Sequence, residues 1–496
     1  MTHALRRLAA YPALLFLLAA AVSVLIYLGV SGAGGAVGFP LDDAWIHQTY
    51  ARNLGLRGEF AFIPGQASAG STSLLWTVLL AIGYGLRLEP HVWAYTLGVL
   101  LLGLNAWLVY RLVLRWWPTA STAALAAGLL VTVEWHLVWS AGSGMETLLY
   151  AASALAIFVL DWPAQAGLAG LVAGLAVLTR PDGLSLLPFL AARAWLARPF
   201  DWRAALRASL GFGLLFGPYL LFNISLSGTP WPNTFYAKQA EYAVLREQPL
   251  WSRLAGVGSL PFIGVLALLL PAILVGAWQA LGRRQWNLLL ALGWAVAVMG
   301  TYALRLPVTY QHGRYLMPVI PVLLALGVGG LAQLVRPRAS QLLARVFSRA
   351  WLAAAALLAL VFWLRGALAY QTDVQIIETE MVATARWVAA NTPADALIAA
   401  HDIGALGYFG GRRVLDMAGL VSPEVIPFIR DQAQLSAWLD RKGANYLETF
   451  PGWYPALTAA RQGQRVFSSG GAISPAAGEK TWRFMFGRQA GSTGLP

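Results

Sequence analysis

Hydrophobic positions in this chain are gathered into long runs rather than into the alternating or one-sided patterns of soluble strands and helices. The first run, about residues 8–30, follows Arg6 and Arg7 and exceeds the roughly 7–15 residues of a signal-peptide core, so we predict an uncleaved helix with its N-terminus inside. Ten further runs approach the roughly 20 residues that cross a bilayer. They lie near 91–114, 119–140, 145–160, 164–180, 182–198, 207–226, 254–281, 286–304, 314–335 and 350–370. The pattern predicts a polytopic α-helical membrane protein with about eleven transmembrane helices.

One apolar segment, Ser73 to Leu88, is short, and its assignment decides the orientation of every later helix. If it does not cross, fourteen arginines fall on one side of the membrane, and if it crosses, twelve of them move to the other. Cytoplasmic loops carry the Lys/Arg excess, so we predict a re-entrant or juxtamembrane helix here. The fourteen are Arg6, Arg7, Arg111, Arg115, Arg193, Arg198, Arg203, Arg207, Arg283, Arg284, Arg336, Arg338, Arg345 and Arg349.

This topology predicts two parts. Residues 1–370 form a transmembrane module whose first outer loop, 31–90, holds the candidate chemistry. Residues 371–496 are less apolar and rich in Gly/Pro turns, which favours a small α/β domain on the outer face. Within it, Ile376 to Asn391 has helical spacing, and Ala396–Ala400 and Val414–Leu415 have the pattern of short strands.

Composition agrees with a membrane protein, because 58% of residues are hydrophobic and 11% charged, with a mean hydropathy of +0.60. The chain has no cysteine, which excludes disulfides, thiolate nucleophiles and Cys-ligated metals. Residues 371–496 carry 11 basic and 11 acidic residues, so the net charge of +13 belongs to residues 1–370. Its arginines lie between apolar runs, a distribution that reflects orientation in a bilayer and argues against nucleic acid as a partner.

Asp42 and Asp43 form a pair of adjacent acids just after the first predicted helix. Like charge and low dielectric both raise carboxylate pKa values, so the pair suits a general base or metal ligand. If a helix starts here, Asp43, His47 and Tyr50 share one face and Asp42 points elsewhere. The structural alternative is that the aspartates cap that helix.

For three further acidic or histidine residues, a structural role competes with a functional one. Glu146 begins the fourth predicted span on the same outer side, where it could act in catalysis or complement the helix dipole. Glu134 and His136, near the end of the third span, we interpret as a buried or interfacial polar pair.

Three basic residues fall in other predicted outer loops. Arg180 lies in a tight hairpin, where its partner is either Asp182 or an anionic ligand such as a lipid phosphate. Lys238 and Arg314 would each fit an interfacial anchor if taken alone. Three cations and three acids on one face suit a reaction in which a carboxylate takes a hydroxyl proton and cations stabilise a departing phosphate.

Six ordered motifs carry a resemblance: LDDAWIHQTYARNL, GMETLLY, LTRPDG, PWPNTFYAK, HGRYLMPVIP and HDIGALGYFGGRRVLDMAGLVSPE. With the acid pair, the short apolar helix and Arg314-Tyr315-x-x-Pro318, they make the chain resemble the GT-C membrane glycosyltransferases over about residues 41–425. These enzymes use polyprenyl-phosphate-linked sugars and include protein O-mannosyltransferases and lipid A aminoarabinose transferases. The motifs look most similar to the branch of the mycobacterial terminal arabinofuranosyltransferases.

The resemblance implies an inverting glycosyltransferase. It would move a monosaccharide, arabinofuranose or another pentose or hexose, from a polyprenyl-phosphate donor to an extracytoplasmic glycan, lipid or protein acceptor. Asp42 matches the family's first acid and would be the general base. Asp43 would position the acceptor or bind a metal, and Glu146 matches the second acidic position.

The same motifs supply the residues expected to contact substrate or lipid phosphate, which are Arg180, Lys238, Arg314, His47, Tyr236 and Tyr315. Two departures from the family pattern are visible. Trp45 replaces the tyrosine that many relatives carry after the acid pair, and the C-terminal part is shorter than in the mycobacterial enzymes.

The resemblance also implies partners and location: a polyprenyl-phosphate-linked sugar, an acceptor and membrane lipids, in the bacterial cytoplasmic membrane, with the site facing the periplasm or exterior. No cofactor is required, although Asp42, Asp43 and His47 could hold a divalent cation such as Mg, Mn or Ca. The alternatives are a transporter or flippase for lipid-linked sugars and a structural assembly protein. A transporter predicts midplane polar residues and inverted repeats, and the predicted spans are nearly bare of charge except near their ends.

Overall fold

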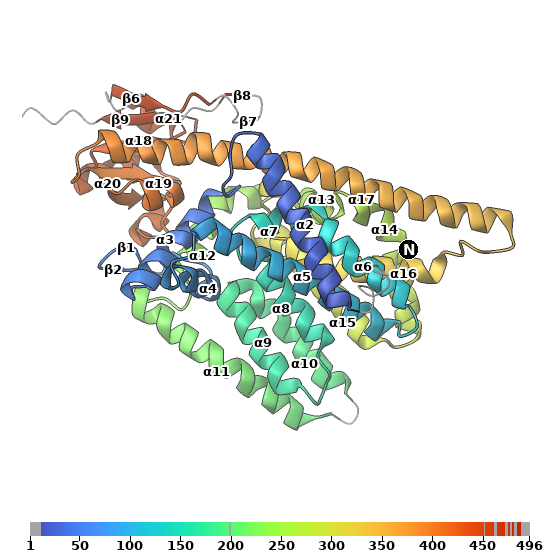
Figure 1. Cartoon of the computed structure of the whole chain (residues 1–496). Helices are drawn as coiled ribbons and strands as arrows, with labels where there is room; N and C mark the ends of the chain where they lie inside the picture. The colour runs from blue at the N-terminus through green and yellow to red at the C-terminus, as the bar shows by residue number, and fades with distance from the viewer. Residues whose placement is uncertain are drawn as a thin grey trace, which may run out of the picture. The chain divides into compact units, whose positions relative to one another are not determined.

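The computed structural model of the chain describes residues 11–197, 200–450, 452–460, 464–471, 475–476, 479–480 and 484–487. Residues 8–10 of the first predicted span, and Arg6, Arg7 and Arg198, lie outside this part. The chain divides into two compact units, each assembled from segments far apart in sequence (Figure 1). The first comprises Met1–Val30, Ala94–Leu220 and Val244–Ala369, and the second Ser31–Trp93, Leu221–Ala243 and Tyr370–Pro496.

Helices build the first unit, and four of them (α2, α5, α11 and α17) run on into the second. They are α2 (Pro12–Ala33), α5 (Pro90–Trp116), α6 (Ser121–Val133), α7 (Trp135–Gly142), α8 (Thr147–Val159), α9 (Ala166–Thr179), α10 (Leu187–Leu196), α11 (Trp202–Ser227), α13 (Leu250–Ser259), α14 (Val265–Gly282), α15 (Trp286–Arg305), α16 (Ile320–Leu334) and α17 (Leu342–Ile376). Short turns of 3₁₀ helix join them, namely η1 (Pro181–Leu186), η3 (Leu260–Phe262), η4 (Gln311–Gly313) and η5 (Met317–Val319).

Seven helical stretches of the described residues are long and apolar enough to cross a membrane, so the chain is an integral membrane protein. An eighth is formed if α6 and α7, which meet at a bend of 51°, count as one span. Three other predicted runs form α8, α9 and α10, with 13, 14 and 10 residues. At 1.5 Å per residue, helices of that size reach about 15–21 Å, short of a hydrocarbon core of about 30 Å. Helix length therefore does not confirm the predicted count of eleven spans.

The ambiguous segment Ser73 to Leu88 forms α4 (Leu74–Gly85), a helix of 12 residues. The side chain of Ser73 accepts a hydrogen bond from the Trp76 N–H and so fixes where the helix starts. Such a helix is too short to cross a bilayer, in agreement with the prediction that it does not span. The orientation that follows from this prediction stays a prediction.

Small residues let two helices of the first unit approach closely. Ala166 on α9 and Ala204 and Ala208 on α11 are buried together. A Cβ atom added to Gly170 would lie 1.9 Å from the Ala208 carbonyl oxygen, and one added to Gly211 would lie 2.2 Å from the Gly167 carbonyl oxygen. Without water to drive association, helices in a bilayer gain contact by bringing their backbones together at such positions.

The second unit contains a five-stranded sheet in the order β4-β3-β5-β9-β6. Strand β3 (Leu397–Ala400) lies between β4 (Arg413–Asp416) and β5 (Tyr446–Thr449) and runs parallel to both. Strand β9 (Phe484–Gly487) is antiparallel to β5 and to β6 (Gln464–Ser468). The two predicted strands thus correspond to β3 and β4.

The other elements of this unit come from all three of its segments. They are α3 (Asp42–Arg57), β1 (Ala61–Ile63), β2 (Gln66–Ala67), α4, α12 (Asn233–Glu241), η6 (Ile377–Val382, a π-helix), α18 (Ala383–Asn391), α19 (Gly404–Phe409), η7 (Pro423–Phe428), α20 (Gln432–Lys442), α21 (Pro455–Ala460), β7 (Pro475–Ala476) and β8 (Glu479–Lys480). The turn η2 (Tyr242–Glu247) follows α12. The predicted helix at Ile376 to Asn391 lies along the end of α17, η6 and α18.

Both faces of the sheet are covered, because the side chains of β3 alternate between two hydrophobic clusters. Ile398 and Ala400 pack with residues of α3, α18 and α19, including Ile46, Val388 and Leu406. Ala399 packs on the opposite side with residues of α20 and α21, including Leu435, Leu439 and Leu457. The loop segment that begins with α3 is therefore part of the same hydrophobic core as the C-terminal sheet.

A partly buried ion pair joins α12 to this sheet. His401, which follows β3, places Nε2 3.1 Å from the Glu241 Oε1 at the end of α12. Burial opposes the charge on His401, but the hydrogen bond and charge of Glu241, together with Asp402 and Asp416, raise its pKa to about 9.

We expect replacement of Gly170 by alanine to destabilise the first unit by roughly 1–3 kcal/mol, because the added methyl group overlaps the α11 backbone. Gly213→Ala on α11 is the matched control, since its added Cβ meets nothing within 4 Å. Thermal unfolding of the two variants in detergent measures the difference. Equal melting temperatures would show that the α9–α11 contact does not limit stability.

The pKa of His401 predicts a pH dependence of stability. A histidine whose pKa is raised on folding stabilises the folded state fully below its unfolded value, about 6.5, and loses that contribution as pH rises through about 9. The melting temperature of the wild-type protein should therefore fall more between pH 6.5 and 9 than that of His401→Gln. Parallel curves for the two proteins would contradict the assignment.

Candidate functional site

Asp42, the first acid of the pair, holds the start of another helix. Its Oδ2 accepts a hydrogen bond from the Gly404 N–H at 2.7 Å, and its Oδ1 accepts one from the Ala405 N–H at 2.8 Å. These are the first two residues of α19, whose N–H groups have no partner inside the helix. The aspartates do not cap their own helix α3, whose N-cap residue is Leu41. Asp42 instead caps a helix 362 residues away along the chain.

Glycine at position 404 allows this contact. A Cβ atom added there would lie 2.0 Å from the Asp42 carbonyl oxygen, closer than any side chain can approach. Beside it, the Trp45 ring packs against Tyr408 and Phe409 of α19, with centroid separations of 4.7 and 4.6 Å. Trp45, noted above as a departure from the family pattern, therefore contributes to the packing of α3 on α19.

Asp43, the second acid, faces a cation and keeps contact with solvent. Its Oδ2 lies 3.7 Å from Lys238 Nζ of α12, and 32% of its side chain is exposed. A charge partner at this distance favours the ionised carboxylate, which can accept a proton. Two predicted site residues, Asp43 and Lys238, thus come together.

Backbone contacts fix α12 in place. The Asn233 N–H donates to the Ala69 carbonyl at 2.9 Å, and the Thr234 hydroxyl donates to the Gly70 carbonyl at 2.7 Å. The Asn233 side chain donates to the Leu420 carbonyl at 3.1 Å. Because α12 is fixed to both the 69–70 loop and the loop after β4, Lys238 and Glu241 are held one helical turn apart on one face.

Two other predicted site residues of this unit lie in different surroundings. His47 is buried, and its Nδ1 lies 3.2 Å from the Ser71 hydroxyl and 3.4 Å from the Thr77 hydroxyl. Tyr236 is half-buried and packs edge-on against Phe235. His47 thus serves the packing of α3 on α4.

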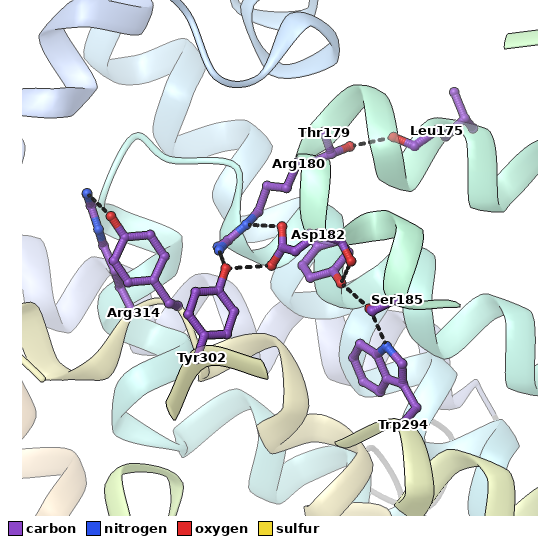
Figure 2. A network of polar contacts seen from close by, with 10 residues as sticks. Leu175, Thr179, Arg180, Asp182, Ser185, Trp294, Tyr302 and Arg314 are labelled. Carbon is purple, nitrogen blue, oxygen red and sulfur yellow. Dashed lines mark hydrogen bonds and ion pairs between the residues drawn. The ribbon is translucent and has the colours of Figure 1, made fainter. Parts of the chain in front are cut away.

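Arg180 in the first unit is the centre of a closed polar network (Figure 2). Its Nε donates to Asp182 Oδ1 at 3.0 Å and its Nη2 to the Tyr302 hydroxyl at 2.6 Å. The Tyr302 hydroxyl in turn donates to Asp182 Oδ2 at 2.7 Å. The structure therefore contains the Asp182 partner that the sequence offered as one alternative. Nη1 of Arg180 donates no hydrogen bond to a described residue, which leaves one edge of the guanidinium for a ligand.

Arg314 contacts the same aromatic ring as Arg180. The Arg180 Cζ is 5.3 Å and the Arg314 Cζ 5.1 Å from the centroid of the Tyr315 ring, and both arginines are 5% exposed. Arg314 Nη2 also donates to the Tyr315 hydroxyl at 3.2 Å. Three of the predicted phosphate-binding residues are thus gathered here, together with Tyr302, whose ring stacks on that of Tyr315 at 5.5 Å.

The turn before Arg314 has an uncommon backbone. Gln311, His312 and Gly313 have φ values of +53°, +56° and +67°, a left-handed conformation that costs side-chain-bearing residues energy. The His312 ring lies edge-on at 5.3 Å to both Trp135 and Trp139. Strain of this kind persists where surrounding packing over-determines it, often at functional positions.

The acids of the first unit occupy different positions. Glu146 is the N-cap residue of α8, is buried, and makes no side-chain capping hydrogen bond. Burial disfavours the charge on Arg180, but Asp182 and Glu146 both stabilise it electrostatically. Glu134 and His136 form the predicted buried pair, at 2.8 Å, where α6 meets α7.

Sequence reasoning missed a polar cluster next to the sheet. The His401 Nδ1 lies 2.7 Å from the Tyr454 hydroxyl, on the side of the ring opposite Glu241. Burial raises the pKa of Asp416, at the end of β4, to about 6, although the N–H groups of Val421 and Ala418 oppose this. The motif HDIGALGYFGG marked this region without indicating that His401 would pair with Glu241.

Within the described residues, no group of three or more histidine, aspartate or glutamate side chains could hold a metal ion. Each unit instead holds its own set of polar side chains. The second unit offers a solvent-accessible carboxylate beside a lysine, which can take a proton. The first offers two buried guanidinium groups on one aromatic ring, which can bind a phosphate.

Comparison with known proteins gives a family match to part of the chain and fold matches to all of it. A family described as a domain of unknown function (DUF8728) matches residues 367–485. No curated protein sequence matches the chain.

Among solved structures, ArnT from Cupriavidus metallidurans bound to undecaprenyl phosphate is similar, with a TM-score of 0.64 and 16% identity, covering 97% of this chain and 99% of that one. Its apo state gives a TM-score of 0.60 at 15% identity, with coverage of 95% and 97%. The arabinofuranosyltransferase AftD from Mycobacteria gives 0.48 at 16% identity, covering 98% of this chain and 40% of that one. The two ArnT structures show that the chain shares the fold of that protein over nearly its whole length.

Proposed function

We propose that this protein is a GT-C glycosyltransferase that moves a monosaccharide from a polyprenyl-phosphate donor to an acceptor hydroxyl. The pair of buried guanidinium groups on the Tyr315 ring carries the proposal. Two cations held in an apolar surrounding are costly unless anions balance them. A lipid phosphate is an anion of the right chemistry for guanidinium groups.

The likeness to ArnT supports a lipid donor of this class, because that protein is bound to undecaprenyl phosphate and covers nearly the whole chain. We assign the donor phosphate to Arg180 and Arg314. Asp182 and Tyr302 hold the Arg180 guanidinium in one plane, with Nη1 left for the phosphate. As the glycosidic bond to phosphate breaks, both cations would stabilise the growing negative charge.

We assign the proton acceptor to Asp43. Both oxygens of Asp42 accept backbone hydrogen bonds from the start of α19, so they are already occupied and hold this residue in a structural role. Asp43 is more open to solvent and is held by Lys238 at 3.7 Å. In this proposal Asp43 takes the proton of the acceptor hydroxyl, whose oxygen then attacks the anomeric carbon opposite the departing phosphate, with inversion. Asp42 positions Asp43 through α19.

The finer features follow the resemblance described above. The donor sugar would be arabinofuranose or another pentose or hexose, and the acceptor an extracytoplasmic glycan, lipid or protein. The protein would lie in a bacterial cytoplasmic membrane with Asp43 facing the exterior. Glu146 would act beside Arg180 by balancing its charge, and a divalent cation is not required by any of these steps.

Arg180→Gln is expected to weaken binding of undecaprenyl phosphate by about 10- to 100-fold, as fits the loss of a charge-assisted contact. Binding is measured on the purified protein in nanodiscs. Arg283→Gln, an exposed arginine of the same unit, is the control and should bind normally. Because Arg180→Gln leaves Asp182 without its charge partner, the double variant Arg180→Gln/Asp182→Asn separates folding from binding. The double variant should recover the melting temperature and still bind undecaprenyl phosphate weakly. If it bound the lipid normally, Arg180 would not be part of the phosphate site.

Asp43→Asn should lower transfer by about 10²- to 10⁴-fold without changing the melting temperature, because it removes the proton acceptor and leaves the packing intact. Asp42→Asn should lower the melting temperature, because one α19 N–H loses its acceptor, at a cost of about 1–3 kcal/mol. Transfer is followed as release of polyprenyl phosphate from synthetic polyprenyl-phosphate sugars, with membranes supplying acceptors. If Asp43→Asn kept its turnover while a folded Asp42→Asn lost it, the base would be Asp42, as the family resemblance implies.

A further inference from the structure

The connections of the sheet in the second unit diverge between two neighbouring parallel strands. Strand β3 lies between β4 and β5, and all three run parallel. The connection leaving β3 leads through α19 to β4 on one side, whereas the connection leaving β5 leads through α21 toward β6 on the other. Where neighbouring connections diverge in this way, ligands bind beyond the carboxyl ends of the strands.

The residues at that position are chemically suited to a ligand. His401 and Asp402 directly follow β3, and Trp453 and Tyr454 follow β5. The hydrogen bond of 2.7 Å between His401 Nδ1 and the Tyr454 hydroxyl shows that the two strand ends meet there. The Trp453 ring stands edge-on to His401 at 5.2 Å and is 47% exposed.

The α12 helix adds one wall to this position. Glu241 reaches the opposite nitrogen of His401 from the last residue of α12, and 22% of its side chain is exposed. Lys238 lies one turn earlier on the same helix and contacts Asp43. The group of His401 and Tyr454 at the strand ends is therefore connected, through the one helical turn between Glu241 and Lys238, to Asp43, the carboxylate that we assign as proton acceptor.

The charges at this position argue against an anionic ligand. Glu241, Asp402 and Asp416 all act electrostatically on His401, so acidic groups outnumber the one histidine cation. The N-terminus of the helix after the first strand, where dinucleotide-binding folds place a phosphate, is occupied by Asp42. The position thus combines carboxylate hydrogen-bond acceptors with an exposed tryptophan ring, a set that suits a neutral polyhydroxylated ring.

From this arrangement we propose that the surface formed at the carboxyl ends of β3 and β5 binds a neutral saccharide. The Trp453 face packs against the apolar side of the sugar ring. The carboxylates of Glu241 and Asp402 accept hydrogen bonds from the sugar hydroxyls. Identifying this sugar as the acceptor of the transfer reaction rests on the proposed function, whereas the binding site itself does not.

The test is binding of full-length protein in nanodiscs to an array of immobilised neutral and phosphorylated oligosaccharides. The wild-type protein should bind neutral glycans and not their phosphorylated counterparts. Trp453→Ala should lower the signal by about tenfold or more, as fits the loss of a stacked aromatic face. Trp251→Ala is the matched control, because Trp251 is 74% exposed but belongs to the first unit, and it should bind as the wild type does.

A second variant guards against a folding defect. Trp453→Tyr keeps an aromatic face and should retain most of the binding, with melting temperature and elution volume checked for every variant. No binding by the wild type to any neutral glycan, equal binding by Trp453→Ala, or binding of phosphorylated glycans alone would each overturn the proposal.

Transfer activity distinguishes this site from the proposed function. Asp43→Asn should bind the same glycan as the wild type and fail to transfer sugar to it. If the wild type binds the glycan and transfers no sugar from any polyprenyl-phosphate donor, the saccharide site stands and the transferase proposal fails. If transfer occurs and Trp453→Ala binds and transfers normally, the transferase proposal stands and the saccharide site fails.

Discussion

The two hydrogen bonds that Asp42 accepts from the start of α19 are the contact on which the second unit depends. They connect the first residue of α3 to the helix that follows β3 of the C-terminal sheet. Every other contact between α3 and α19 requires the same alignment, including the Trp45 ring on Tyr408 and the Arg52 hydrogen bond to the Tyr408 carbonyl at 2.9 Å. A carboxylate is well suited to this position, because one group satisfies two N–H donors at the positive end of a helix dipole.

This constraint explains why two adjacent acids have different roles. Successive residues of a helix point about 100° apart, so when Asp42 is directed toward α19, Asp43 must be directed elsewhere. It meets Lys238, which α12 holds through the backbone contacts of Asn233 and Thr234. The packing of the unit thereby places one acid in a structural contact and leaves the other beside a lysine, partly exposed to solvent.

Local features of the structure were predictable from the sequence, and distant contacts were not. The long apolar runs identified most helices, and the spacing around Ile398 and Val414 identified two strands. Arg180 and Asp182 are two residues apart, so their pairing could be weighed from the sequence. By contrast, Asp42 meets α19 across 362 residues, and Asp182 meets Tyr302 across 120. A tyrosine near the end of an apolar helix gives no local signal that it will complete an ion pair, and a single acid gives none that it will cap a remote helix.

The arginine cluster shows how a membrane protein can keep cations buried. The charge of Arg180 is balanced by Asp182 and Glu146, and its guanidinium is fixed by the Tyr302 hydroxyl. Arg314 follows a turn with three left-handed residues, whose energetic cost must be offset by the packing of His312 between two tryptophans. Both guanidinium groups lie on the negative face of the Tyr315 ring system, which attracts cations without neutralising them. A strained backbone, a shared ring and two carboxylates therefore hold two like charges close together, and this proximity has a physical use when an anion lies between them.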